Sequence, residues 1–218
     1  MASNHVSFAD IYGESLELVR RHFGLLAATG AAIAAGYTAL DMLGAAGANL
    51  VINLIVSIMV QYLVLERLLA DRISQEGKGK RRYGSMLGAG FLSGLGILLG
   101  LVALVLPGIY LSGRWLSASS FVVAEGNGST EALNSSWEAS RNSAGAHVIV
   151  VMVASLPLVG FLAIAYLAGF FSEVETGLVN SIATNVMTAL STLSYWVFGA
   201  GAYRATRPHN AQLEGVFA

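Results

Sequence analysis

Residues 104–126 read LVLPGIYLSGRWLSASSFVVAEG, and this stretch decides how the rest of the chain is interpreted. Pro107 has no backbone N–H and Gly108 tolerates many backbone angles, so the pair can end one helix and begin the next. From Pro107 to Glu125 the chain has roughly 18 residues, which extend about 27 Å as a helix. That length nearly matches a bilayer core of about 30 Å. The stretch therefore predicts a sharp corner followed by a short membrane helix.

Arg114 lies about two turns into this predicted helix. A guanidinium that faces lipid at such a depth costs on the order of 3 kcal/mol or more. The side chain is therefore expected to face other helices, water or a lipid headgroup. Three interpretations stay open: Arg114 fixes helix packing through an ion pair or a carbonyl clamp, it binds a lipid phosphate, or it lines the path of a transported anion.

The composition is typical of an integral membrane protein. Of the 218 residues, 55% are hydrophobic and 11% are charged, and the mean hydropathy is +0.65. A soluble domain usually has about 25% charged residues. Cysteine is absent from the sequence, which excludes disulfides, thiolate zinc sites and cysteine nucleophiles. The net charge of −1 gives no reason to expect a nucleic-acid partner.

Apolar stretches that approach or exceed ~18 residues mark candidate membrane spans. Together with the Arg114 helix they predict six spans, at residues 23–43, 50–69, 85–106, 109–124, 146–170 and 178–203. Residues 7–22 and 129–142 have apolar and charged faces, which predicts two amphipathic helices. The first of these lies either on the membrane surface or against the end of the bundle. The predicted fold class is all-α: residues 1–218 form one membrane domain, a six-helix bundle with two cytoplasmic amphipathic helices.

Glycine and proline predict how these spans pack. Gly90 and Gly94, and likewise Gly96 and Gly100, form small-residue pairs that favour close helix contact in a membrane. Pro157 lies inside the fifth predicted span, where it is expected to kink the helix and free a backbone carbonyl.

Positive charge falls on one side of this topology. With six spans, the side that holds both termini receives every Lys and Arg residue except Arg114, while the opposite side receives Asp41, Glu173 and Glu175. Lys and Arg collect on the cytoplasmic side of membrane proteins. Both termini are therefore expected in the cytoplasm.

The basic loop around residues 78–82 has two interpretations. Its cations attract anionic headgroups at about 1 kcal/mol each, or they only orient the chain. Trp137 suits an interfacial position on the second amphipathic helix. The candidate residues for lipid or partner binding are Arg114, Lys78, Lys80, Arg81, Arg82, Trp137 and Arg141, and the expected structural residues are Pro107, Gly108, Glu125 and Pro157.

Residues 13–24 (GESLELVRRHFG) align with residues 134–145 (NSSWEASRNSAG) at an offset of 121 residues. The alignment matches a serine, a glutamate, an arginine and a glycine, and each segment leads into a predicted outward-going span. The match predicts a parallel internal repeat. Transporters use such repeats, but a repeat also serves to build a symmetric bundle.

Several short motifs recur together in one known family. They are LPGIYL at 106–111, Arg114, VAEG at 123–126, EAL at 131–133, SW at 136–137 and GKGKRRYGSML at 77–87. With the N-terminal segment, they resemble the bacterial glycerophosphoryl diester phosphodiesterase membrane-domain family over most of the chain. In fused members of that family, catalysis is attributed to a separate soluble barrel domain with acidic metal ligands and histidines. The resemblance implies a membrane module of the bacterial inner membrane, and not an esterase.

The sequence gives no pattern of catalytic residues. His5, His22, His147 and His209 share no ligand spacing, and phosphate-loop, nucleophile-elbow and HExxH motifs are absent. We therefore expect no enzymatic activity, no cofactor and no metal. The predicted function is binding of phospholipid headgroups or of membrane partners, either other membrane proteins or a second copy of the chain. The alternative is a small transporter or permease subunit with Arg114 in an anion path.

Overall fold

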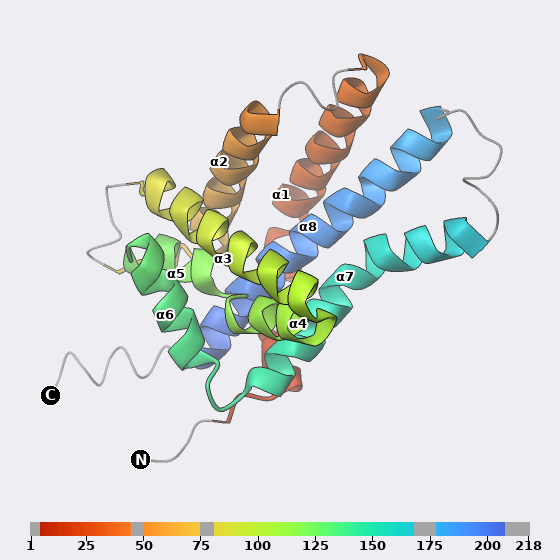
Figure 1. Cartoon of the computed structure of the whole chain (residues 1–218). Coiled ribbons are helices and arrows are strands. Elements are labelled where there is room, and N and C mark those ends of the chain that lie inside the picture. The colour runs from red at the N-terminus through yellow and green to blue at the C-terminus, as the bar shows by residue number, and fades with distance from the viewer. Residues whose placement is uncertain (1–4, 45–49, 75–80, 168–177, 208–218) are drawn as a thin grey trace, which may run out of the picture.

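The computed structural model describes residues 5–44, 50–74, 81–167 and 178–207 (Figure 1). Throughout these ranges the regular structure is helical and no strand occurs, which confirms the all-α prediction. The helices are α1 (Phe8–Met42), α2 (Leu50–Leu68), α3 (Tyr83–Ala103), α4 (Val105–Arg114), α5 (Ala118–Glu125), α6 (Ser129–Ala139), α7 (Ala144–Leu167) and α8 (Leu178–Thr206).

α1 joins two elements that the sequence predicts separately. Ser7 caps its start, because the Ser7 hydroxyl accepts from the Asp10 amide and the Asp10 carboxylate accepts from the Ser7 amide. The helix then continues through His22, where φ of −118° and ψ of 23° mark a kink. The predicted amphipathic helix 7–22 and the predicted span 23–43 therefore form one kinked helix. Ile11 and Leu18 are buried, so its first part packs against the bundle.

α1 and α8 lie side by side along much of their length (Figure 1). Gly201 of α8 lets the backbones approach, since a Cβ atom there would lie 3.0 Å from the Ile11 carbonyl oxygen. Near the other end of α1, the Asn185 amide of α8 donates to Asp41 Oδ2 at 2.7 Å and to Thr38 Oγ1 at 3.2 Å. The pair is thus fixed by contacts near both ends.

The predicted helix 109–124 is two helices. α4 ends at Arg114 and α5 begins at Ala118, with a turn between them. The corner before α4 also differs from expectation, because α3 ends at Ala103 and Leu104 is extended, with φ of −162° and ψ of 138°. Pro107 lies in the first turn of α4, where a missing N–H costs no helical hydrogen bond.

Glycines hold α3 and α4 close together, although not all of the predicted pairs take part. A Cβ atom on Gly100 would lie 2.9 Å from the Gly108 amide nitrogen, and one on Gly108 would lie 2.7 Å from the Leu101 amide nitrogen. A Cβ on Gly90 or Gly94 would meet no atom within 4 Å. The close contact therefore depends on Gly100 and Gly108.

α7 continues through Pro157. The amide of Leu158 donates to the Ser191 hydroxyl of α8 at 3.0 Å. Ser155 also hydrogen-bonds Tyr195 of α8, with 2.7 Å between the hydroxyl oxygens. Polar groups near the proline are thus paired with α8.

Within the described residues, three helices are long and apolar enough to cross a membrane: α1, α3 and α7. Their outer faces expose large apolar side chains, among them Phe91, Leu98 and Leu99 of α3 and Leu156 and Val159 of α7. Such extended apolar surface is rare on soluble monomers, and it indicates a membrane protein.

The two segments of the predicted repeat have different local structures. Residues 13–24 lie inside the single helix α1, whereas residues 134–145 include the end of α6, a turn and the start of α7. The repeat stays a prediction.

The contact between α3 and α4 gives a first prediction. Gly108→Ala should lower the free energy of unfolding by about 1–3 kcal/mol, because its methyl group would overlap Leu101. Gly90→Ala, which meets no neighbour, should be neutral or stabilising by up to about 1 kcal/mol. Unfolding by SDS titration in mixed micelles measures both, and equal stability of the two variants would refute the close contact.

Candidate functional site

The break between α4 and α5 is closed by serines of α6. In a continuous helix the Arg114 carbonyl would accept from the amide of Ala118, but that amide bonds to the Trp115 carbonyl instead. The freed Arg114 carbonyl accepts from Ser136 Oγ at 2.8 Å and from Ser140 Oγ at 3.3 Å. Both serines are fully buried. α6 and its C-terminal cap therefore supply the hydrogen bonds that the Arg114 carbonyl loses at the break between α4 and α5.

The side chain of Arg114 is enclosed by aromatic rings. It is 3% exposed, and its guanidinium carbon lies 4.1 Å from the centre of the Trp137 ring and 5.9 Å from that of Tyr110. Its Nε atom is buried without a hydrogen-bond partner. Neither an ion pair nor a carbonyl clamp forms in the described part of the chain, so the cation–π contact with α6 takes their place.

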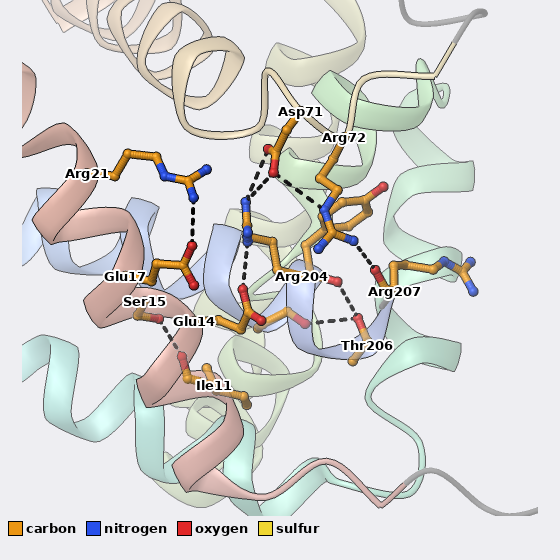
Figure 2. Close-up of polar contacts among 12 residues, drawn as sticks. Ile11, Glu14, Ser15, Glu17, Arg21, Asp71, Arg72, Arg204, Thr206 and Arg207 are labelled. Carbon is orange, nitrogen blue, oxygen red and sulfur yellow. Dashed lines mark hydrogen bonds and ion pairs between the residues drawn. The ribbon is translucent and has the colours of Figure 1, made fainter. Parts of the chain in front are cut away.

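A second cluster surrounds Arg204 in the last turn of α8 (Figure 2). Its side chain is 6% exposed, its Nε atom lies 2.7 Å from Glu14 Oε2, and its Nη1 atom lies 2.9 Å from Asp71 Oδ2. Glu14 belongs to α1 and Asp71 follows α2. One buried cation therefore ties three segments together.

Neighbouring residues extend this cluster to α5. Arg72 Nη1 donates to the Arg207 carbonyl at 2.8 Å (Figure 2). Arg207 Nε in turn donates to Glu125 Oε1 at 3.2 Å. The Tyr203 hydroxyl donates to the same Glu125 oxygen at 3.3 Å. Glu125, predicted as a structural residue, thus ends α5 beside the last turn of α8.

Electrostatics keep Arg204 charged. Burial acts to lower the pKa of Arg204, but its hydrogen bond to Glu14 and the negative charge of Asp71 outweigh burial and raise the pKa above its ordinary value. The sequence predicted only that Arg204 lies with the other cations on the cytoplasmic side, and it did not reveal the cluster. The only local signal was the position of two acidic residues, Glu14 in the predicted amphipathic helix 7–22 and Asp71 just after the predicted span 50–69.

The predicted binding residues are not brought together. Lys78 and Lys80 lie outside the described residues. Arg81 is exposed and pairs with Glu66 at 3.0 Å, and exposed Arg141 pairs with Glu138 at 3.6 Å. The amide of Arg82 donates to the Tyr62 hydroxyl at 3.3 Å. Of the predicted binding residues that the structure describes, only Trp137 contacts Arg114.

Two cavities run along α1. One lies between α1 and α8, has a volume of about 560 Å³ and is almost entirely apolar. The other lies among α1, α2 and α8 and has a volume of about 700 Å³. A third hollow, of about 490 Å³, adjoins Arg204 and is lined by charged residues of α1. Arg114 lines none of these three.

Among the described residues, no group of three or more His, Asp or Glu side chains is placed to hold a metal ion. The expected lack of enzymatic activity stays a prediction. No family model, curated protein or solved structure matches the chain. The resemblance to the phosphodiesterase membrane-domain family likewise stays a prediction.

The Arg204 cluster gives a second prediction. Arg204→Gln leaves Glu14 and Asp71 without their shared cation, so the free energy of unfolding should fall by about 2 kcal/mol, less than for fully buried pairs because both carboxylates are partly exposed. Arg21→Gln is the control, since Arg21 and Glu17 form an exposed pair worth under about 1 kcal/mol. SDS titration in mixed micelles measures both. Similar losses in both variants would contradict a special role for Arg204.

The break between α4 and α5 gives a third prediction. The double substitution Ser136→Ala with Ser140→Ala removes both donors to the Arg114 carbonyl and should cost about 1–3 kcal/mol. Asn134→Ala, at an exposed position of α6, should change stability by less than about 0.5 kcal/mol. Hydrogen exchange at residues 114–118 reports the same loss locally, and unchanged protection there would show that α6 does not hold the break.

Proposed function

We propose that the chain is a non-enzymatic, polytopic protein of the bacterial inner membrane that binds an anionic phospholipid. The observation that carries this proposal is the apolar cavity between α1 and α8. Beside its lining residues, α1 carries an exposed arginine, Arg20, that makes no ion pair with any described residue.

The topology we propose has six crossings, with α4 and α5 together forming one broken crossing. The contact of Glu14 with Arg204 places the beginning of α1 and the end of α8 at the same end of the bundle. Arg72 and Arg207 lie at that end as well. This gathering of Arg residues supports a cytoplasmic location for that end and for both termini.

The cavity suits a lipid acyl chain. Its wall is formed on α1 by residues such as Leu16, Val19 and Phe23, and on α8 by Leu190 and Leu193. Its volume of about 560 Å³ lies within the usual range for sites that bind small molecules. An acyl chain buried there gains the free energy of apolar contact without needing a hydrogen bond.

Arg20 supplies the charge that an anionic headgroup needs. It follows Leu16 by four residues and precedes Phe23 by three, so it neighbours both on the helix surface. It is exposed and makes no ion pair with any described residue, whereas Arg21 next to it pairs with Glu17 at 2.9 Å. A phosphate at the rim of the cavity would form a charge-assisted hydrogen bond with Arg20.

The alternative of an anion path through Arg114 has less support. The Arg114 guanidinium is covered by Trp137, and it lines none of the cavities described above. An anion that moves past it would first have to displace the indole ring.

Lipid retention tests this function. In nanodiscs that mix phosphatidylglycerol with phosphatidylcholine, native mass spectrometry should show phosphatidylglycerol retained by the wild type. Arg20→Gln should lower this retention about five-fold, the effect of roughly 1 kcal/mol for one cation near a headgroup. Arg21→Gln, which removes an already paired cation, should change it by less than about two-fold.

A second pair of variants tests the cavity itself. Ala27→Leu places a larger side chain in the cavity wall and should reduce retention, while Ala35→Leu lies on α1 outside both cavities and should not. The proposal fails if retention is the same in the wild type, Arg20→Gln and Ala27→Leu.

A further inference from the structure

The second cavity differs from the first in its polar lining. α1, α2 and α8 line an open-sided space of about 700 Å³, and its lining residues include Thr29, Tyr37, Ser57 and Thr192, which carry hydroxyls, and Trp196. None of the residues that line it is charged. We propose that this cavity binds an uncharged amphiphile that carries hydroxyl or carbonyl oxygens.

Several hydroxyl groups elsewhere in the long helices bond within the protein. Ser155 donates to the Val151 carbonyl at 2.9 Å, and Thr188 donates to the Thr184 carbonyl at 2.9 Å. The Ser191 hydroxyl accepts from the Leu158 amide. Bonding of this kind to the preceding turn is the usual solution for a Ser or Thr inside an apolar helix.

The hydroxyls at the cavity do not follow that pattern. Thr29, Tyr37, Ser57 and Thr192 make no hydrogen bond with any described residue. They come from three different helices, and all four residues line the same space. Because a hydroxyl without a partner is unfavourable in apolar surroundings, their convergence points to a bound molecule that hydrogen-bonds them.

The rest of the lining limits what that molecule is. Ala28, Ala32 and Ile33 of α1 and Val56 and Val60 of α2 make most of the wall apolar. Water alone would face these side chains without hydrogen bonds, and an ionised ligand would lack a counter-charge. A plain acyl chain would leave the hydroxyls unpaired. An uncharged lipid with oxygen atoms at one end, such as a diacylglycerol or an isoprenoid quinone, would pack its chain against the apolar side chains and hydrogen-bond the hydroxyls.

This cavity is separate from the phospholipid cavity. Its wall on α1 uses residues such as Ala28, Ala32 and Gly36, while the cavity against α8 alone uses Ala27, Gly30 and other residues of a different face. The inference therefore goes beyond the proposed function, and each site can be altered without touching the other.

Binding of two probes tests the inference. The purified full-length chain in phosphatidylcholine nanodiscs is mixed with dioleoylglycerol in one arm and with a long-chain ubiquinone in the other, and native mass spectrometry measures the bound fraction. We expect the wild type to bind at least one probe, and the arm that binds identifies its chemical source. The triple variant Thr29→Val, Ser57→Ala and Thr192→Val should weaken that binding by at least roughly ten-fold, because each lost hydrogen bond costs about two- to ten-fold.

Ser194→Ala is the matched control for the hydroxyl variant. Ser194 lies two residues from Thr192 on α8 and lines the other cavity, so its loss should leave probe binding unchanged.

A second variant fills the space and keeps the hydroxyls. A Cβ on Gly36 would meet no atom within 4 Å, so Gly36→Leu fits the fold and should block the probe. Gly90→Leu in α3 is equally free of neighbours, lines neither cavity and should bind like the wild type.

The inference is overturned if the wild type binds neither probe, or if the triple variant and Gly36→Leu bind as well as the wild type. Phosphatidylglycerol retention that depends on Arg20 would still hold in that case, so the two proposals fail separately.

Discussion

A buried guanidinium at position 204 is the constraint on which the arrangement of the long helices depends. Arg204 is 6% exposed and touches carboxylates from α1 and from the segment after α2. A cation taken out of water is costly unless opposite charges stay in contact with it. The last turn of α8 therefore holds the first part of α1 and the end of α2 beside it, and Arg207 brings Glu125 of α5 to the same end. Segments that are distant in sequence converge there (Figure 2).

The interrupted helix between Leu104 and Glu125 shows a second constraint, the need of the backbone for hydrogen bonds. When α4 stops at Arg114, its carbonyl loses the helical donor and takes two serine hydroxyls of α6 instead. The same short helix covers the Arg114 guanidinium with Trp137. α6 is amphipathic, as its sequence predicts, and its contacts with Arg114 are made by Ser136 and Trp137, with Ser140 at its C-terminal cap. The segment SSWEAS thus acts as the partner of a broken crossing.

Local sequence features predicted the parts of this structure that depend on local physics. Hydropathy predicted all-helical structure and apolar helices, and Pro107 with Gly108 marked a corner that occurs a few residues earlier, at Leu104. The kink at His22 falls where two elements were expected to meet. The break after Arg114 and the cluster around Arg204 were missed, because both depend on distant partners. Arg204 and Glu14 are 190 residues apart, and neither periodicity nor composition carries that information.

The two cavities follow from how α1 and α8 are held. Glu14 and Arg204 tie the helices at one end, and Asp41 and Asn185 tie them near the other. Between these ties α1 carries alanine and glycine on more than one face, so its neighbours meet little side-chain volume there. With both ends fixed, the helices cannot close over the missing volume without breaking the Glu14–Arg204 ion pair or the hydrogen bond between Asn185 and Asp41. The space along α1 is therefore preformed, and binding of a ligand there needs no free energy to separate the helices.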